Sequence, residues 1–222
     1  SDCLEILLAA ADTYPRAAIL GPKALGWHDR RLLLELGFSI TGSGRRTTGL
    51  ERREHDQGQH DERSEVHAVG SAGMLIRRDA WDALDGFDTC LPLYRDDLDL
   101  CWRTWRAGHE VRVVPEAVIH HREASYHGRR EGSTQSARGH RLDRRSALHV
   151  LLAQTPAWRL PFTALRLAIG SLVRSLVYLL GKDLRRAGDE IAAIGSIVAH
   201  PGRVAASRRH IRETSTMTSR EA

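Results

Sequence analysis

The stretch LYRDDLDLCWRTWRAGHEVRVVPEAVIHH, residues 93–121, decides how this sequence folds. Asp96, Asp97 and Asp99 stand at the head of a run of apolar residues that recur at helical spacing. Carboxylates at a helix start accept hydrogen bonds from unpaired backbone N–H groups and interact favourably with the helix dipole. A helix over 97–107 is therefore predicted. The same carboxylates could instead form a metal site or supply a catalytic base, and the surrounding residues must decide between these roles.

The residues on both sides of this helix alternate short apolar strands with short helices. The expected elements are a helix at 4–11, strands at 17–25 and 74–76, a helix at 79–84 that begins at Asp79, and a strand at 111–115 that leads to two adjacent histidines, His120 and His121. Helices and strands mixed in this order predict an α/β fold.

Two polar segments interrupt this pattern. Residues 42–65 are almost wholly polar, which predicts a long surface loop or a disordered insertion. Residues 122–146 are rich in Arg and Gly and predict a second loop. An anionic acceptor or a diphosphate could bind the arginines there, while exposure to solvent is the alternative for most of them; they are Arg129, Arg130, Arg138, Arg144 and Arg145.

The last third of the chain, 147–222, reads as helix. Apolar residues recur at Leu165, Ile169, Leu172, Leu176 and Leu179, and after a break near Gly181 at Leu184, Ala187, Ile191, Ile194 and Val198. This spacing predicts two amphipathic helices. The first contains Arg166 and Arg174, and each arginine costs roughly 2.5–3.5 kcal/mol at the centre of a bilayer. A helix lying in the membrane interface therefore fits better than a membrane span. A soluble hairpin that packs its stripes together or against the rest of the protein is the alternative.

Charge and cysteine content narrow the class of protein. The 222 residues carry a formal net charge of +5, and the positive charge is nearly all arginine, because Lys23 and Lys182 are the only lysines. Arginine binds phosphate through two parallel hydrogen bonds, which favours anionic partners. The three cysteines form no CxxC pair, which argues against a disulfide framework and a zinc site and fits a reducing compartment. The sequence opens within a helical pattern, without Met or signal peptide, so we expect a fragment.

An ordered series of short motifs runs through residues 1–121. It consists of the small-residue strand GSAGMLIRR, the turn GFD, the acidic pair with Arg103 on the helix that follows, and the strand VPEAVIHH. In this order the series resembles the C-terminal half of the catalytic domain of family-2 glycosyltransferases, which are inverting enzymes of the glycosyltransferase-A fold. The resemblance implies a partial glycosyltransferase-A, Rossmann-like fold. It does not reach the last third, which would be an α-helical, membrane-associated extension.

The resemblance also assigns roles to individual residues. Asp97 matches the catalytic aspartate of the family, and Asp96 takes the place of the glutamate that usually precedes it. Asp96 and Arg103 would bind substrate. His121 matches a terminal histidine that ligates the divalent metal in some members. A small-residue run would let a sugar approach the backbone, with tight strand packing as the alternative; it comprises Gly70, Ser71, Ala72 and Gly73.

The implied reaction is transfer of a sugar from a nucleotide-sugar donor to a glycan or lipid-linked acceptor, with inversion. A carboxylate within hydrogen-bond reach can take the proton of the acceptor hydroxyl, and Mg²⁺ or Mn²⁺ would offset the charge on the departing diphosphate. The DxD metal ligands of the family would lie upstream of Ser1, so the chain alone is expected to be inactive.

The expected location is peripheral, on the cytoplasmic face of the plasma membrane. No nucleic-acid-binding motif is visible, so nucleic acid is not an expected partner. The alternative function is a non-catalytic basic module that binds membrane or nucleic acid.

Overall fold

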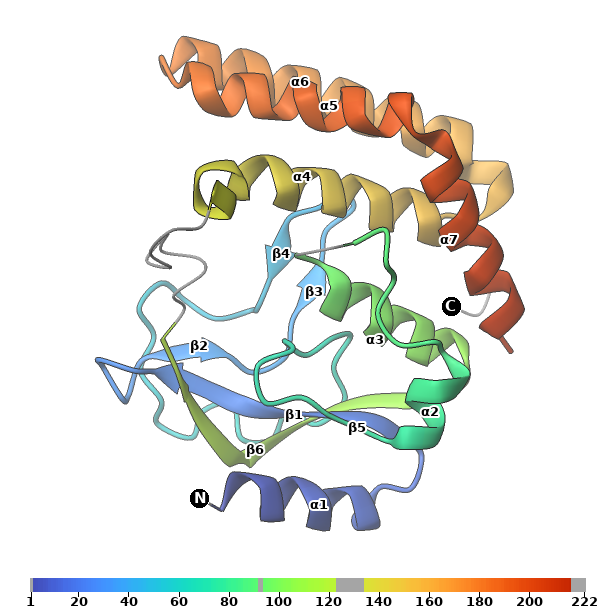
Figure 1. Cartoon of the computed structure of the whole chain (residues 1–222). Helices are drawn as coiled ribbons and strands as arrows, with labels where there is room; N and C mark the ends of the chain where they lie inside the picture. Colours follow the sequence, from blue (N-terminus) through green and yellow to red (C-terminus); the bar gives the residue numbers. More distant parts are fainter. Residues whose placement is uncertain (1, 92–93, 123–133, 217–222) are drawn as a thin grey trace.

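The protein is built as a stack of layers, which Figure 1 shows edge-on. The computed structural model describes residues 2–91, 94–122 and 134–216, with side chains from residue 139 in the last range. Helix α1 lies on one side of a small sheet and α3 on the other, α4 follows, and the pair α5–α6 is outermost. The helices are α1 (Cys3–Thr13), α2 (Arg78–Ala83), α3 (Asp96–Arg106), α4 (Thr134–Gln154), α5 (Leu160–Leu180), α6 (Leu184–Ala199) and α7 (Pro201–Thr214). The strands are β1 (Ala17–Gly26), β2 (Leu33–Glu35), β3 (Ser39–Ile40), β4 (Arg46–Thr47), β5 (Leu75–Ile76) and β6 (Glu110–His121).

The long strand β1 is the centre of the sheet. It pairs in parallel with β6, from Ala17 opposite Glu110 to Gly26 opposite His121, and antiparallel with β2 and β5. Strands β3 and β4 form a separate antiparallel pair. Nearly every residue of β1 is buried, as its continuous run of apolar and small residues requires of a strand covered on both faces. The predicted mixed α/β fold followed by a helical region is confirmed.

Two apolar clusters fix the helices against opposite faces of the sheet. On one face, Leu7 of α1 packs with Leu20 of β1. On the other face, Leu98 of α3 packs with Ile19 of β1. The tryptophans of α3 are partly buried against this second cluster, and Trp105 Nε1 donates to backbone carbonyls at 3.2 and 3.3 Å. The start of α3, where the acidic residues lie, is therefore held rigidly over the sheet.

Most of the expected elements are present with shifted bounds. The helix predicted over 97–107 spans Asp96–Arg106. The helix expected to begin at Asp79 starts one residue earlier, and Asp79 Oδ1 accepts a hydrogen bond from the Ala80 N–H at 2.8 Å. The strand predicted to end at 115 continues through both histidines, because its pairing with β1 extends to Gly26.

The prediction of a loop over 122–146 is wrong from Thr134 onward, since α4 begins there. Gly139 and the many arginines suggested a loop, but apolar residues in the second half of α4 pack against α6 and make the helix part of the core. Residues 123–133, with Arg129 and Arg130, lie outside the described residues, as does the side chain of Arg138.

The polar segment 42–65 is a folded cover on the sheet and not a disordered insertion. Strand β4 lies within it. The buried Lys23 of β1 donates to Asp56 at 3.0 Å and to Asp61 at 2.5 Å. Arg63 donates to the Thr48 carbonyl at 3.0 Å. These contacts tie the segment to the sheet, which its composition alone did not reveal.

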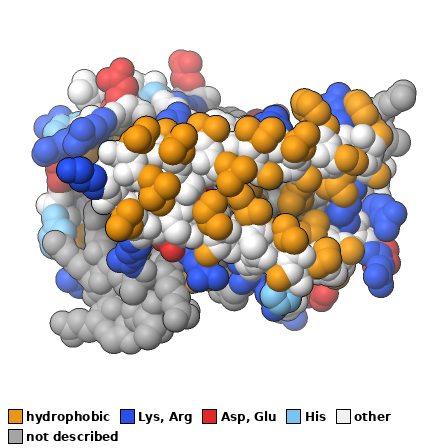
Figure 2. All heavy atoms as spheres, turned by 90° about the horizontal axis from the view of Figure 1, so that it is seen from above, with side chains coloured by type: hydrophobic (Ala, Val, Ile, Leu, Met, Phe, Trp, Pro, Cys, Tyr) orange, Lys and Arg blue, Asp and Glu red, His pale blue; other side chains and the backbone are white. Residues whose placement is uncertain are grey.

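The outermost helix α5 exposes its apolar residues and buries small and polar ones. Its buried positions are Thr163, Leu167, Ser171 and Ser175. The predicted stripe of Leu165, Ile169, Leu172, Leu176 and Leu179 is instead 48–61% exposed. Figure 2, which views the molecule from this side, shows a broad apolar surface along the outer helices. The alternative of a soluble hairpin that buries this stripe is therefore wrong.

Candidate active site

The carboxylate of Asp97 lies in the first turn of α3. Its Oδ1 accepts a hydrogen bond from the Leu98 N–H at 2.7 Å, as expected for a carboxylate at a helix start. Its Oδ2 lies 3.7 Å from the Arg46 Nη1 atom. Asp97 is 8% exposed, so one carboxylate oxygen is tied to the helix and the other faces a cation.

Arg46 joins Asp97 to a second carboxylate, that of Glu35. The Arg46 guanidinium forms an ion pair with Glu35 Oε2 and stacks on the Phe38 ring, with 3.4 Å from Cζ to the ring centroid. Glu35 Oε1 accepts a hydrogen bond from the Gly70 N–H at 2.6 Å. We call Glu35, Arg46 and Asp97 the acidic triad; it brings together β2, β4 and α3.

Burial raises the pKa of Glu35, the positive charge of Arg46 and the Gly70 N–H oppose that rise, and the negative charge of Asp97 adds to it. Burial likewise raises the pKa of Asp96, and the charge of Asp97 raises it further. Asp96 is half-buried at the helix start.

The turn before the acidic pair is strained. Tyr94 and Arg95 have φ values of 64° and 65°, a left-handed conformation that is unfavourable for residues with a Cβ and that often occurs at functional sites. Helix α4 holds this turn: Arg95 Nε and Nη2 donate to the two Asp143 carboxylate oxygens at 2.7 and 3.1 Å. A Cβ at Gly139 would lie 3.1 Å from the Tyr94 hydroxyl oxygen, so a glycine suits this position.

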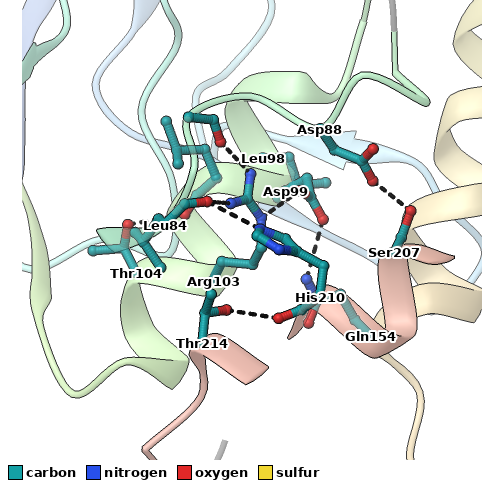
Figure 3. A network of polar contacts seen from close by, with 12 residues as sticks. Leu84, Asp88, Leu98, Asp99, Arg103, Thr104, Gln154, Ser207, His210 and Thr214 are labelled. Atoms are coloured by element: carbon teal, nitrogen blue, oxygen red, sulfur yellow. Dashed lines mark hydrogen bonds and ion pairs between the residues drawn. The ribbon is translucent and has the colours of Figure 1, made fainter. Parts of the chain in front are cut away.

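Arg103 is a structural residue, which corrects the expectation that it binds substrate. It is 1% exposed, and Figure 3 shows its guanidinium enclosed by protein groups. Its Nε donates to Asp99 Oδ2, and its Nη1 and Nη2 donate to the carbonyls of Leu84 and Gly86, each at 2.7 Å. All three guanidinium nitrogens donate to protein groups, and the side chain exposes almost no surface to a substrate. Arg103 instead fastens the GFD turn to α3.

The same network joins α7 to the GFD turn and the end of α4 to α3 (Figure 3). Ser207 donates to Asp88 Oδ2 at 2.5 Å, and Gln154 Nε2 donates to Asp99 Oδ1 at 3.2 Å. Burial alone would raise the pKa of Asp88, but hydrogen bonds from His149, Ser207 and the Cys90 N–H outweigh it and hold that pKa well below its usual range. The GFD turn is thus a junction between the α/β part and the helical layer.

The small-residue run borders the acidic triad at its first glycine. A Cβ at Gly70 would lie 2.9 Å from Glu35 Oε1, so any side chain there would disturb the Glu35 carboxylate. Gly73 has a φ of +78°, and its Cβ would lie 2.9 Å from Pro22 Cγ. Ser71 is exposed and Ala72 half-buried. Tight packing explains both glycines, and only Gly70 contacts the triad.

Residues 3–141, well over half of the chain and including Glu35, Arg46 and Asp97, match the family described as "Glycosyltransferase like family 2". The chain belongs to this family. Two curated proteins of Mycobacterium tuberculosis, from strains CDC 1551 / Oshkosh and ATCC 25618 / H37Rv, are similar to it, and both are named N-acetylglucosaminyl-diphospho-decaprenol L-rhamnosyltransferase. Each is 28% identical over 152 residues, which are 60% of this chain and 47% of the relative. The chain therefore spans about half the length of these relatives.

The expected metal ligand of this family-2 glycosyltransferase chain, His121, lies at the end of β6 and is exposed. The half-buried His120 has its Nδ1 atom 3.2 Å from the Gly26 carbonyl oxygen. Among the described residues no group of three or more His, Cys, Asp or Glu side chains could hold a metal ion, and a hard divalent cation requires several oxygen ligands. The part of the chain described here does not form a divalent metal site by itself.

A surface hollow of about 420 Å³ lies beside α2 and the GFD turn. It is lined by Trp81, Asp82, Asp85, Gly86 and Phe87. None of the acidic-triad residues lines it, so it is separate from the candidate active site of this glycosyltransferase chain.

Sequence reasoning missed Glu35 and Arg46 altogether. Glu35 sits in a segment with only a short strand, and Arg46 is one of several arginines in a polar stretch. The one available signal was the acidic residue within the otherwise apolar LLLELGF, because a carboxylate beside a buried strand usually has a charged partner.

Proposed function

We propose that this chain forms the acceptor side of a glycosyltransferase catalytic site, in which Asp97 is the general base. The observation that carries the proposal is the position of Asp97: a carboxylate held at the start of α3 within the segment that matches the family. The donor is a nucleotide sugar, and the acceptor is a hydroxyl of a glycan or of a lipid-linked saccharide.

The proposed reaction is a single displacement. The acceptor oxygen attacks C1 of the donor sugar and loses its proton to Asp97, while the bond between C1 and the diphosphate oxygen breaks and the nucleoside diphosphate leaves with the electron pair. Attack from the side opposite the leaving group inverts the configuration at C1. Proton transfer to a positioned base contributes roughly 10²–10⁴-fold to such reactions.

The surroundings of Asp97 suit this role. The Leu98 N–H fixes one carboxylate oxygen, which leaves the other as the oxygen that receives the proton. Arg46 contacts that second oxygen at 3.7 Å, longer than a hydrogen bond. An arriving acceptor hydroxyl would therefore displace Arg46 from that oxygen.

Mg²⁺ or Mn²⁺ belongs to the proposal, with His121 as one candidate ligand and the others outside the described residues. When bound, the cation would offset the negative charge that develops on the departing diphosphate. Asp97, Arg46 and Glu35 act on the acceptor and do not depend on it.

The two relatives are named for transfer to a decaprenol-linked saccharide. We therefore propose a lipid-linked acceptor, a peripheral location on the cytoplasmic face of the plasma membrane, and a role in cell-envelope polysaccharide biosynthesis. The apolar outer surface over α5 supports a membrane location.

The test is Asp97→Asn in the full protein that contains this chain. Turnover should fall roughly 10²–10⁴-fold while affinity for the nucleotide sugar stays nearly unchanged, because the base acts in the transition state and not on the donor. Turnover is measured as release of nucleoside diphosphate and donor affinity by calorimetric titration. Asp96→Asn is the matched control and should cost much less. Undiminished turnover of Asp97→Asn would refute the assignment.

A further inference from the structure

Helix α5 exposes its apolar face and buries a more polar one, whereas a helix on a water-soluble domain does the opposite. Its buried stripe is Thr163, Leu167, Ser171 and Ser175, while Phe162, at 71%, is among several apolar residues that are largely exposed. A helix on a soluble protein buries its apolar face, and exposed apolar surfaces of this extent mark interaction sites. The outward side of α5 therefore requires an apolar partner.

Helix α6 continues the same surface. Helices α5 and α6 pack along one another, and Figure 2 shows one apolar surface over the outer helices with Lys and Arg side chains around its edges. We call this surface the outer face; it is defined by Phe162, Leu165, Leu172 and Leu176 of α5 with Leu184 and Ile191 of α6, all 46–71% exposed.

The inward side of both helices combines apolar contacts, such as Leu167 and Ala193 against α4, with buried polar and charged groups. Glu190 of α6 is fully buried and forms ion pairs with Arg144 of α4 at 2.9 Å and with Arg174 of α5 at 3.2 Å. Ser175 donates to the Ala187 carbonyl at 3.0 Å. A lone buried carboxylate is very unfavourable, so Arg174 and Arg144 hold α5 and α6 down on α4.

These contacts decide between spanning and lying on a membrane. Within the described residues one helix, Ala157–Leu180, is long and apolar enough to cross a bilayer, on length and composition alone. Insertion of α5 across a bilayer would separate Arg174 from Glu190 and carry a charge into hydrocarbon. Docking of the outer face on the bilayer surface keeps every one of these ion pairs.

The charge around the outer face indicates which lipids it meets. Residues 157–216 contain ten Lys and Arg against four Asp and Glu, an excess of six positive charges. Arg159, Lys182 and Arg185 are exposed beside or at the ends of the two helices. Cations near an apolar surface contact the phosphates of anionic lipids, at about 1 kcal/mol per residue.

We propose that the outer face of α5 and α6 docks on a bilayer rich in anionic lipids, with both helices in the plane of the membrane and the remainder of the chain on the aqueous side. The docking proposal specifies how the chain contacts the membrane named in the proposed function. It rests on that proposed function only for the identity of the enzyme. The binding test below uses no catalysis, so the two proposals fail separately.

Two glycines provide substitutions that do not disturb the fold. A Cβ at Gly188 or at Gly195 would meet nothing within 4 Å. Both glycines are exposed on α6, and Gly195 lies four residues after Ile191 on the same side of the helix. Gly195→Glu adds a charge to the outer face and replaces a poor helix former with a good one.

The experiment is vesicle flotation of the purified 222-residue chain, with vesicles of phosphatidylcholine alone and of phosphatidylcholine with an equal part of phosphatidylglycerol. The wild-type chain should float with the anionic vesicles and much less with the neutral ones. Gly195→Glu combined with Leu172→Glu should lower the bound fraction about tenfold or more, since each carboxylate opposes contact with the bilayer surface. Leu8→Glu, on α1 at the opposite end of the stack (Figure 1), is the matched control and should bind as the wild type does.

Several outcomes would overturn the proposal. The first is absence of flotation of the wild-type chain. The second is flotation of the double variant Gly195→Glu/Leu172→Glu equal to that of the wild type, when circular dichroism shows that the variant is folded. The third is retention of the chain in the membrane after alkaline carbonate extraction, which would indicate a membrane span. Sedimentation velocity tests a second copy of the chain as partner: a dimer without lipid that Leu172→Glu dissociates would make the outer face a self-association surface. A monomer that floats only with anionic vesicles supports the proposal.

Discussion

At the scale of single residues, the candidate base is not isolated but shares a cation with a second carboxylate. Arg46 lies between Glu35 and Asp97, and the Phe38 ring beneath it limits where its guanidinium can go. We expect Arg46 to be a positioning residue: its positive charge lies between the carboxylates of Glu35 and Asp97 and favours their ionised forms. An acceptor hydroxyl that approaches Asp97 would then displace a single, weakly bound partner.

Arg46→Ala should shift the acidic limb of the kcat/KM profile to higher pH. Burial already raises the pKa of Glu35, and the charge of Arg46 opposes that rise; without Arg46 the pKa rises further, so Glu35 stays protonated and the triad stays out of its working charge state up to a higher pH. The measurement is kcat/KM against pH for the full protein. Arg45→Ala, an exposed neighbour, is the control and should leave the profile unchanged. A uniform loss of activity at all pH values would contradict the role.

At the scale of elements, α4 controls the geometry at the start of α3. Asp143 binds the Arg95 guanidinium through two hydrogen bonds, and Gly139 leaves room for the Tyr94 hydroxyl. Two consecutive left-handed residues relax to ordinary conformations unless their surroundings hold them. The loop that precedes Asp97 therefore takes its shape from a helix some fifty residues later in the sequence.

Asp143→Ala should lower kcat by roughly 10- to 100-fold with little change in the donor KM, because release of the strained turn misplaces Asp97 and leaves donor contacts unchanged. Steady-state kinetics of the full protein provide the measurement. Arg141→Ala, exposed on the same helix, is the matched control. If Asp143→Ala raised KM alone, the turn would serve binding and not the base.

Local pattern was sufficient to predict α3, β1 and the two outer helices, because strong periodicity coincides there with burial or with an apolar surface. It failed for α4, whose first half is mostly polar. Asp143 pairs with Arg95 just before α3, and Arg144 pairs with Glu190 of α6; such distant pairs leave no trace in local spacing. Asp97 came from an ordered motif series, whereas Arg46 and Glu35 meet Asp97 only in the folded chain. Arg103 was misassigned because its spacing on the helix does not reveal that all its partners are internal.

At the scale of the whole molecule, buried polar contacts join the layers at two places, in addition to the apolar packing of α4 against the outer helices. The GFD turn binds α7 through Asp88 and Ser207. Glu190 joins α4, α5 and α6 through two arginines. Polar joints of this kind suit helices whose apolar sides are directed outward.

Glu190→Gln should destabilise the folded chain by about 3–5 kcal/mol, because it leaves Arg144 buried without its counter-charge. Burial lowers the pKa of Arg144 and the charge of Glu190 opposes that shift, so loss of Glu190 removes a counter-charge that the buried guanidinium needs. Equilibrium unfolding in urea gives the free energy. Glu213→Gln, exposed on α7, is the control. A decrease in the free energy of unfolding below about 1 kcal/mol would mean that water already reaches Glu190 and its two arginines.

The order of the layers sets how far Asp97 lies from the outer face. Helix α4 separates the outer pair from α3 (Figure 1), and one spacing between packed helices is roughly 8–10 Å, so α3 lies more than one such spacing from the outer pair. A chain resting on its outer face would hold Asp97 at that elevation above the lipid headgroups. Saccharides would then be selected by reach: a lipid-linked acceptor must raise its free hydroxyl to the level of Asp97. Acceptors one sugar too short or too long would be poor substrates even where their chemistry is identical.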